Sequence, residues 1–216
     1  MKLDKDQIRM VIALFLVAAI AAILLGLTDI ATREPIAAAQ KAALHQALRQ
    51  VLPQHANDPQ NDRITMGPAD DKVDIYPARD SDGHTVGLAW EVVAPDGYSG
   101  SIHILVGVRP DERIYAIRVT EHHETPGLGD GIVKNHNWVS SFMNQSLNSK
   151  IWKVKKDGGD FDQFTGATIS PRAVVKAVKS ALLFFNSHKQ AILGRLAVQK
   201  GVSPDQHPEN NKAGTQ

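Results

Sequence analysis

The sequence predicts an α+β fold: a mostly antiparallel sheet with flanking helices, preceded by a single N-terminal transmembrane helix. Three features favour this class. Residues 10–27 are apolar without a break, short strand-like stretches separated by turns lie between residues 73 and 120, and helical spacing of apolar residues dominates from residue 132 onward. Strands that come before the helices, instead of alternating with them, are typical of an antiparallel sheet covered by helices.

The N-terminal region has the length and charge pattern of a membrane anchor. The 18 apolar residues 10–27 would rise about 27 Å as a helix, close to the ~30 Å hydrocarbon core of a bilayer. We expect a retained transmembrane helix; a cleaved signal peptide is the competing interpretation, because the alanines at 37–39 could supply a cleavage site. Basic residues crowd residues 1–9, which predicts a cytoplasmic N-terminus and places the rest in the periplasm of a Gram-negative cell.

The first half of the remaining chain predicts a helix, a loop and a run of strands. Residues 28–56 are expected to be a membrane-proximal helix and linker, in which the helix covers 32–51 and Pro53 stops it. Residues 57–71 are polar and punctuated by proline and glycine, so they predict a loop. The strands are expected at residues 73–76, 85–94, 101–108 and 113–120.

The second half predicts mainly helices. One is expected over residues 132–145, with its apolar side formed by Val133, His136, Val139 and Met143. A short strand is expected over residues 151–155, and the last helix begins near Pro171. Residues 203–216 have almost no apolar content and predict a disordered tail, so residues 70–194 would form the folded domain.

Composition excludes several classes of function. The 216 residues carry a net charge of +1, which gives no electrostatic reason to expect a nucleic-acid partner. The chain has no cysteine. Disulfides, thiolate catalysis, iron–sulfur ligation and c-type haem attachment are therefore excluded, and a redox cofactor would have to be organic or held by histidines and carboxylates.

Residues 160–171 (DFDQFTGATISP) join a glycine-containing turn to the last helix. Ser170 suits the N-cap of that helix and Pro171 its first position. Thr168 would therefore lie just ahead of a helix N-terminus, where unpaired N–H groups and a partial positive charge favour a phosphate. No lysine follows the glycine as a P-loop requires, which argues against a nucleoside triphosphate. A plain turn followed by a helix cap is the simpler alternative.

A second turn-rich segment, Glu124–Gly129 (ETPGLG), follows the fourth expected strand. Its glycines and proline favour a tight loop that lets backbone N–H groups approach a planar ring, although a plain surface loop has the same composition. Residues 127–132 resemble a dinucleotide fingerprint, but Ile132 replaces its third glycine and no βαβ unit surrounds it. His122 and His123 lack metal-binding spacing and would point to opposite sides of a strand end, so no metal site is expected.

The motif Asp162-x-x-Thr165-Gly166-Ala167-Thr168 resembles the covalent-flavin motif of the FMN-binding domain family. Residues 124–129 and Gly97-Tyr98-Ser99-Gly100 match the same family in the same order. The resemblance implies that a flavin transferase recognises the motif and joins the phosphate of FMN to Thr168 by a phosphoester bond, which would make the chain a flavoprotein and a phosphoprotein. The noncovalent FMN contacts that it implies are Tyr98, Glu124, Thr125, Pro126, Gly127, Leu128, Gly129, Thr165, Gly166 and Ala167.

Over roughly residues 8–194 the chain resembles the G subunits of Rnf-type electron transport complexes, also called Rsx. The resemblance implies an electron-relay subunit, with no catalysis of its own, in an ion-translocating ferredoxin:NAD oxidoreductase of the inner membrane. Its partners would be the other membrane subunits, the flavin transferase during maturation, and lipid. A C-type subunit of the sodium-pumping NADH:quinone reductase and a non-redox periplasmic scaffold domain are the alternatives. Thr165 stands where many members have serine, which keeps the hydroxyl.

Overall fold

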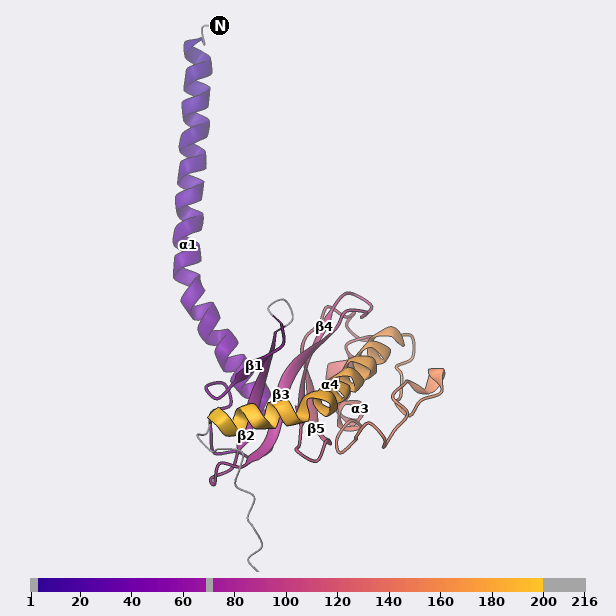
Figure 1. The fold of residues 1–216 in the computed structure, drawn as a ribbon. Helices are drawn as coiled ribbons and strands as arrows, with labels where there is room; N and C mark the ends of the chain where they lie inside the picture. Colours follow the sequence, from indigo (N-terminus) through magenta and orange to yellow (C-terminus); the bar gives the residue numbers. More distant parts are fainter. Residues whose placement is uncertain (1–3, 69–71, 200–216) are drawn as a thin grey trace, which may run out of the picture. The chain divides into compact units, whose positions relative to one another are not determined.

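The computed structural model describes residues 4–68 and 72–199, so the tail predicted at 203–216 lies outside the described residues. The chain divides into two compact units, residues 1–46 and 47–216, which are considered separately. Helix α1 (Lys5–Val51) belongs to the first unit except for its last residues, from Ala47 on. All other helices and strands lie in the second unit (Figure 1).

Residues 10–27 and 32–51 are helical as predicted, and the helix ends at Val51 as predicted. The predicted separation between the two ranges is wrong, because they belong to one continuous helix of 47 residues. The polar residues between them bond to the helix itself instead of breaking it. The hydroxyls of Thr28 and Thr32 donate to carbonyl oxygens four residues back, and Arg33 forms an ion pair with Asp29 at 2.6 Å. Pro35 lies inside the helix.

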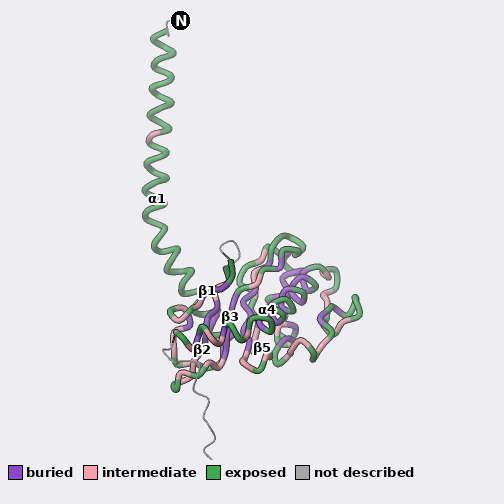
Figure 2. The backbone as a smooth tube through the Cα atoms, in the orientation of Figure 1, coloured by how far each residue is buried: buried purple, intermediate pink, exposed green. Residues whose placement is uncertain are grey.

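The apolar part of α1 is long enough to span a membrane. Its most apolar 18-residue window has a mean hydropathy of 3.0, and none of that window is buried within the protein. Figure 2 shows the same stretch as exposed except for one short segment of intermediate burial. A 47-residue helix is about 70 Å long, more than twice the ~30 Å hydrocarbon core, so only part of α1 can lie in lipid tails.

The second unit is built on a five-stranded sheet in which neighbours in sequence are neighbours in space, and all pairs are antiparallel. All four predicted strands are confirmed, and the one predicted at 85–94 keeps both of its predicted ends. The first strand was missed, because its three residues are too few to show a period and only pairing with the next strand reveals it. The strands are β1 (Ile64–Met66), β2 (Val73–Arg79), β3 (Thr85–Ala94), β4 (Ile102–Val108) and β5 (Ile114–Glu121).

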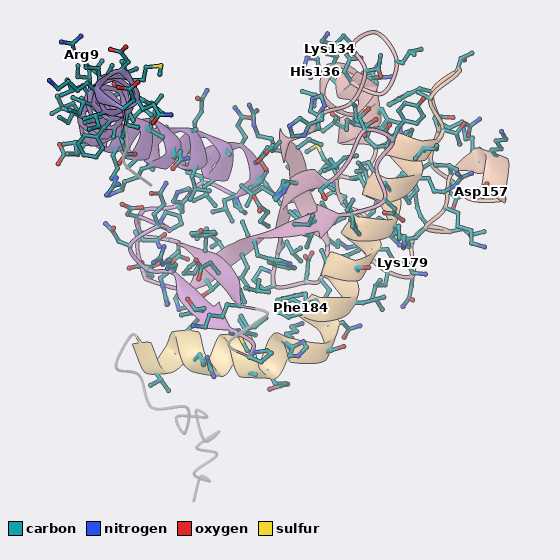
Figure 3. All side chains as sticks on the ribbon, turned by 90° about the horizontal axis from the view of Figure 1, so that it is seen from above. Arg9, Lys134, His136, Asp157, Lys179 and Phe184 are labelled. Carbon is teal, nitrogen blue, oxygen red and sulfur yellow. The ribbon has the colours of Figure 1, made fainter. Side chains whose placement is uncertain are left out.

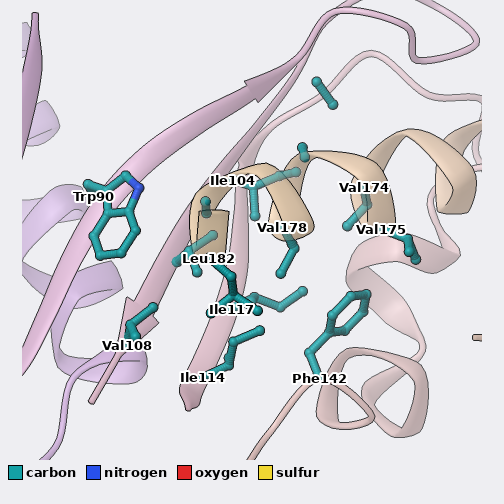
Figure 4. Packing of buried hydrophobic residues seen from close by; sticks show 14 of the residues in the cluster. Trp90, Ile104, Val108, Ile114, Ile117, Phe142, Val174, Val175, Val178 and Leu182 are labelled. Carbon is teal, nitrogen blue, oxygen red and sulfur yellow. The ribbon is translucent and has the colours of Figure 1, made fainter. Parts of the chain in front are cut away.

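Helix α4 (Ile169–Gln199) packs on one face of this sheet. The register aligns one apolar residue from each strand in a row across that face: Ile64, Ile75, Trp90, Val106 and Ile117. Helix α4 adds residues at helical spacing, and Figure 4 shows Val178 and Leu182 beside Ile117. Burial of these side chains at roughly 1.5–3 kcal/mol each makes this interface the main core of the unit.

The end of α1 packs within the second unit, with Leu48, Val51 and Leu52 almost fully buried. Two strand glycines make this approach possible. A Cβ atom on Gly107 would lie 1.6 Å from the carbonyl oxygen of Val51, and one on Gly87 would lie 2.5 Å from the ring of Pro53. The sheet is therefore covered on both faces, by α4 on one and by residues 47–53 on the other.

The predicted helix over 132–145 is wrong in its length and its buried side. It is replaced by α2 (Gly131–Lys134) and α3 (His136–Ser140), separated at Asn135, whose side chain accepts a 3.1 Å hydrogen bond from the N–H of Trp138 and so caps α3. The buried residues are Ile132, Trp138 and Phe142, whereas Val133 and Met143 are exposed. An asparagine favours caps over helix interiors because its side chain competes for backbone N–H groups.

The strand predicted at 151–155 is also wrong. Only Val154 forms a bridge, with Phe161, and the 3₁₀ helix η1 (Lys155–Asp157) follows at once. Two backbone hydrogen bonds accompany this bridge, from Lys155 to Phe161 and from Phe161 to Lys153, and aromatic packing adds to them. The centroids of the Phe142 and Phe161 rings are 4.6 Å apart, and those of Trp152 and Phe161 are 5.1 Å apart. This aromatic cluster lies directly before the segment that carries Thr168.

Candidate functional site

Helix α4 begins at Ile169, two positions before Pro171, which was predicted to be its first residue with Ser170 as the N-cap. The carbonyl oxygen of Thr168 accepts a 3.2 Å hydrogen bond from the N–H of Arg172, so Thr168 occupies the N-cap position. Ser170 lies inside the first turn and is 1% exposed. Thr168 and Ser170 both carry a hydroxyl suited to a cap. The hydroxyl of Ser170 is instead used in a hydrogen bond to Glu124, which leaves the cap position to Thr168.

The turn before α4 is shaped by glycine and held by an aromatic residue. The N–H of Ala167 donates to the carbonyl oxygen of Phe164 at 3.0 Å, and Gly166 has a φ of +77°, which L-residues with a side chain rarely adopt. Phe164 packs edge-on against Trp138, with 5.3 Å between ring centroids, and sits so close to Gly131 that a Cβ there would lie 2.8 Å from the ring. Thr165 and Gly166 are both exposed at the surface.

The upstream end of the motif is anchored separately. The backbone carbonyl of Asp162 accepts a hydrogen bond from Trp138, while the exposed carboxylate of Asp162 pairs with Lys155 at 2.6 Å. On the other side of the turn, Arg172 holds Asp157 through two hydrogen bonds of 2.6 and 2.9 Å. The position of Asp157, labelled in Figure 3, shows that η1 lies outside the first turns of α4. The motif of residues 162–168 is therefore connected to the rest of the domain on both sides.

The Glu124–Gly129 loop is closed by Asp130. A carboxylate oxygen of Asp130 accepts a 2.8 Å hydrogen bond from the N–H of Gly127, whose φ is +79°, and the other oxygen pairs with Lys134 at 2.6 Å. The hydrogen bond to Lys134 is the largest influence that lowers the pKa of Asp130 below its ordinary value. The ionised carboxylate thus stabilises the tight turn that the glycines permit.

Glu124 connects the three segments that the sequence singled out. Its Oε1 accepts a 3.2 Å hydrogen bond from the N–H of Ser99, and its Oε2 accepts a 2.6 Å bond from the hydroxyl of Ser170. Glycines make room for it: a Cβ on Gly97 would lie 2.8 Å from Oε1, and one on Gly129 would lie 2.6 Å from Oε2. Residues 97–100, 124–129 and 162–170 therefore meet at one buried carboxylate.

These segments enclose a cavity of about 310 Å³, near the lower end of the ~300–1,000 Å³ range of small-molecule sites. Seven of the ten predicted noncovalent contacts line it, together with Thr168. Ile169 and Ser170 also line it and were not predicted, because Ser170 was expected to be the helix cap and Ile169 gave no signal of its own. Three predicted residues, Pro126, Gly127 and Thr165, belong to the adjoining turns instead of the wall. The lining residues are Tyr98, Glu124, Thr125, Leu128, Gly129, Gly166, Ala167, Thr168, Ile169 and Ser170.

The wall of the cavity combines a helix N-terminus, which is suited to an anion, with apolar surface. The helix N-terminus is that of α4, a 31-residue helix whose first N–H groups have no partner within the helix. The apolar part comes from Tyr98, Leu128 and Ile169, which remain 67%, 48% and 41% exposed. A flat ring with a phosphate tail fits such a wall, and the small residues Gly166 and Ala167 leave the hydroxyl of the half-buried Thr168 accessible.

The two histidines before this loop do not form a metal-binding group in the described residues. The Nδ1 atom of His122 accepts a 3.2 Å hydrogen bond from the N–H of Glu124, which gives it a structural partner. The grouping of three potential ligands found in the described chain is Asp80, Asp82 and His84, in the exposed turn between β2 and β3. There Asp80 accepts hydrogen bonds from the N–H groups of Asp82 and His84, as an ordinary turn residue does.

Comparison with known proteins confirms the predicted family. The FMN-binding domain family matches residues 97–183, a span that contains every residue lining the cavity. The G subunit of the ion-translocating oxidoreductase complex of Aliivibrio fischeri (strain MJ11) is 45% identical over 198 residues, which cover 85% of this chain and 91% of that protein. The corresponding G subunit of Haemophilus influenzae (strain ATCC 51907 / DSM 11121 / KW20 / Rd) is 45% identical over 177 residues, which cover 78% and 84%.

Among solved structures, the crystal structure of Shewanella oneidensis NqrC aligns with a TM-score of 0.46 and 24% sequence identity, over 62% of this chain and 74% of that one. The identity and coverage shared with the two G subunits are far higher. The chain therefore belongs to the family of G subunits of ion-translocating oxidoreductase complexes, and its second unit contains an FMN-binding domain.

Proposed function

We propose that Thr168 carries one FMN, joined through its phosphate by a phosphoester bond, and that the chain relays electrons within an Rnf-type ion-translocating complex. One observation carries this proposal: Thr168 caps the N-terminus of α4 and at the same time lines the cavity. A phosphate on its hydroxyl would meet the unpaired N–H groups of that helix end. The ring would then have to lie within reach of the same cavity.

The rest of the chain is suited to a relay role. A bound flavin can pass one or two electrons, so it can join carriers of either kind. The residues of this chain would bind and orient it: Tyr98 and Leu128 present apolar surface to the ring, and the small residues before Thr168 admit the ester. A relay role requires only that the flavin accept and donate electrons, so we propose that the subunit turns over no substrate on its own.

The transferase that attaches FMN would recognise the motif from its exposed side. The carboxylate of Asp162 and the turn at Gly166 are exposed, while Phe164 between them anchors the turn to Trp138. The enzyme can therefore contact the motif without unfolding the domain. The apolar residues of the cavity wall remain partly exposed, so they would hold a noncovalent flavin weakly. A covalent bond to Thr168 would prevent its loss.

We further propose that α1 anchors the chain in the inner membrane, with its N-terminus in the cytoplasm and the FMN domain in the periplasm. The apolar stretch of α1 and the basic residues before it support this orientation. Its lipid contact and the other subunits of the complex would be the permanent partners, and the flavin transferase a transient one. A reporter enzyme that is active only in the periplasm should be active when fused to the C-terminus, and a reporter that is active only in the cytoplasm should be inactive there.

Mass spectrometry of the full chain co-produced with a flavin transferase tests the attachment. The intact mass should rise by one FMN less one water, and denatured gel bands should fluoresce under ultraviolet light. Thr168→Ala should abolish both signals, whereas Thr168→Ser, which keeps a hydroxyl at the helix cap, should retain them. Thr125→Val is a matched control, because it removes a different hydroxyl from the same cavity.

The alternatives give different results. If wild-type protein stays colourless after exposure to an active transferase, the chain is a scaffold domain and the proposal fails. If flavin remains in Thr168→Ala, another residue carries it. A component of a quinone reductase would carry the flavin but co-purify with quinone reductase subunits, so mass spectrometry of the membrane complex that retains this chain separates the two redox assignments.

A further inference from the structure

Buried polar side chains are concentrated at one place in the described chain. Three polar or charged residues have less than a tenth of their surface exposed there: Glu124 at 4%, Asp130 at 6% and Ser170 at 1%. Asp130 has a cationic partner, Lys134. Glu124 has none among the ion pairs of residues 4–68 and 72–199, although it lines the cavity. Burying an unpaired charge is costly, so its presence in a cavity wall points to a function.

The hydrogen bonds of Glu124 are those of an ionised carboxylate. Both oxygens accept, one from the N–H of Ser99 and one from the hydroxyl of Ser170. An ionised carboxylate is acceptor-only, and an O–H···O⁻ bond is typically about 2.5–2.7 Å long, which the 2.6 Å distance to Ser170 matches. Ser170 belongs to the first turn of α4, whose partial positive charge also favours an anion.

We propose that Glu124 sets the reduction potential of the bound flavin by placing a fixed negative charge in the wall of its cavity. This inference rests on the proposed function, because it requires FMN on Thr168. Reduction adds electrons to the flavin, and its protons come from solvent. A fixed negative charge in the cavity wall disfavours any negative charge left on the ring by Coulomb repulsion. The carboxylate therefore lowers the potential and makes the reduced cofactor a stronger donor.

Glu124 lies close to the end of the cavity at which we propose that the phosphate is attached. The ester on Thr168 adds its own negative charge at the start of α4, which the helix dipole partly offsets. Glu124 reaches the first turn of that helix from the opposite loop, so it adds charge beside the cofactor without competing for Thr168 itself. Glycine at positions 97 and 129 leaves space for this carboxylate, since a Cβ there would lie 2.8 Å from its Oε1 and 2.6 Å from its Oε2, respectively.

Redox titration of the flavin in full-length, FMN-loaded protein tests the inference. Glu124→Gln removes the charge and keeps both contacts, since the amide oxygen can accept from Ser99 and the amide nitrogen can donate to Ser170. We expect the reduced-to-oxidised ratio at a given potential to rise about tenfold, which is a positive shift of about 30 mV for a two-electron couple. An unchanged or lower potential in Glu124→Gln, or a failure of that variant to acquire FMN, would overturn the inference.

Three control variants separate charge from structure. Glu124→Asp keeps the charge and should change the reduced-to-oxidised ratio by less than about twofold. A change of about tenfold in Glu124→Asp would overturn the inference, and this test remains available if Glu124→Gln does not fold. Ser170→Ala removes a contact and keeps the charge, and should not raise the potential. Asp130→Asn removes a charge that Lys134 already offsets outside the cavity wall, and should shift the potential less than Glu124→Gln.

Failure of this inference can be distinguished from failure of the proposed function. If wild-type protein acquires no FMN, the proposed function fails, and there is no flavin whose reduction potential could be measured. If wild-type protein carries FMN on Thr168 but Glu124→Gln has the same potential, only the role of Glu124 is refuted.

Discussion

The indole N–H of Trp138 donates a 2.7 Å hydrogen bond to the backbone carbonyl of Asp162. Asp162 is the first residue of the attachment motif, residues 162–168, in which we propose that FMN is joined to Thr168. Trp138 is almost fully buried, and its ring also packs edge-on against Phe142, at 5.0 Å between centroids. One side chain thus joins α3, the aromatic cluster and the segment that leads to Thr168. The contact holds the start of the motif against the buried part of the domain.

Trp138→Phe should weaken the domain and slow its flavin loading. The smaller ring keeps apolar contact but loses the hydrogen bond to Asp162, at a cost of roughly 1–2 kcal/mol. Urea unfolding of the full chain in mild detergent, followed by the fluorescence of Trp90 and Trp152, measures the stability. Trp152→Phe is the matched control: it also loses a hydrogen bond in the cluster, to the carbonyls of Ser146 and Leu147, but should load FMN at the normal rate. Equal loading rates for the two variants would contradict this account.

Leu182→Ala and Leu183→Ala should differ sharply although the two residues are adjacent on α4. Leu182 is 2% exposed and packs in the core, whereas Leu183 is 48% exposed. The first substitution should lower the free energy of unfolding by about 2–5 kcal/mol, and the second by less than about 0.5 kcal/mol. Tryptophan fluorescence during urea unfolding reports both. Similar losses for both would show that α4 does not pack on the sheet as described.

Gly107→Ala should be among the most destabilising single changes in the domain. Its Cβ would lie 1.6 Å from the carbonyl oxygen of Val51, and backbone cannot move aside as a flexible side chain can. We expect a loss of roughly 3 kcal/mol or more, or no soluble folded domain. Gly194→Ala is the control, because nothing lies within 4 Å of its Cβ position and alanine in a helix should add about 0.5–1 kcal/mol. A tolerated Gly107→Ala would refute the packing of residues 47–53 on this face of the sheet.

Acid should weaken the domain partly through Asp157. Its hydrogen bond from Arg172 is the main cause that lowers its pKa below the ordinary value of 3.8. The unfolded chain then binds the proton more readily, so this stabilisation is present above about pH 4 and is lost as the pH falls through the lower folded-state pKa. Asp157→Asn should therefore lose less stability than wild-type protein as the pH falls from about 5 to about 2.

The measurement for Asp157 is urea unfolding at several pH values, at low and at high salt. Because the pair lies at the surface, salt should reduce the difference between wild-type protein and Asp157→Asn. Parallel pH profiles for the two proteins at low salt would show that the ion pair contributes nothing. Asp111→Asn, in the connection between β4 and β5, is a suitable control carboxylate away from the attachment motif.

Much of the fold was predictable because its signals are local. Residues 85–94 and 102–108 are short runs rich in apolar and β-branched residues, which predict strands. The last helix shows helical spacing through Val174, Val178 and Leu182. The elements that were wrong depend on single side chains. Asn135 ends α2 by capping α3, and residues 151–155 are held by aromatic packing instead of a paired strand. Neither effect has a period that a sequence pattern could show.

The candidate site divides in the same way. The sequence by itself determined that a small-residue turn ends in a hydroxyl at Thr168 ahead of a helix, and that a glycine-rich loop follows the fourth predicted strand, because turn and cap preferences act over a few residues. Only the tertiary structure decided that Ser170 bonds to Glu124 instead of capping the helix, and that Gly97 and Gly129 leave space for that carboxylate. The partners are 46 residues apart in the chain, and a buried charge finds its hydrogen bonds only when packing has brought distant segments together.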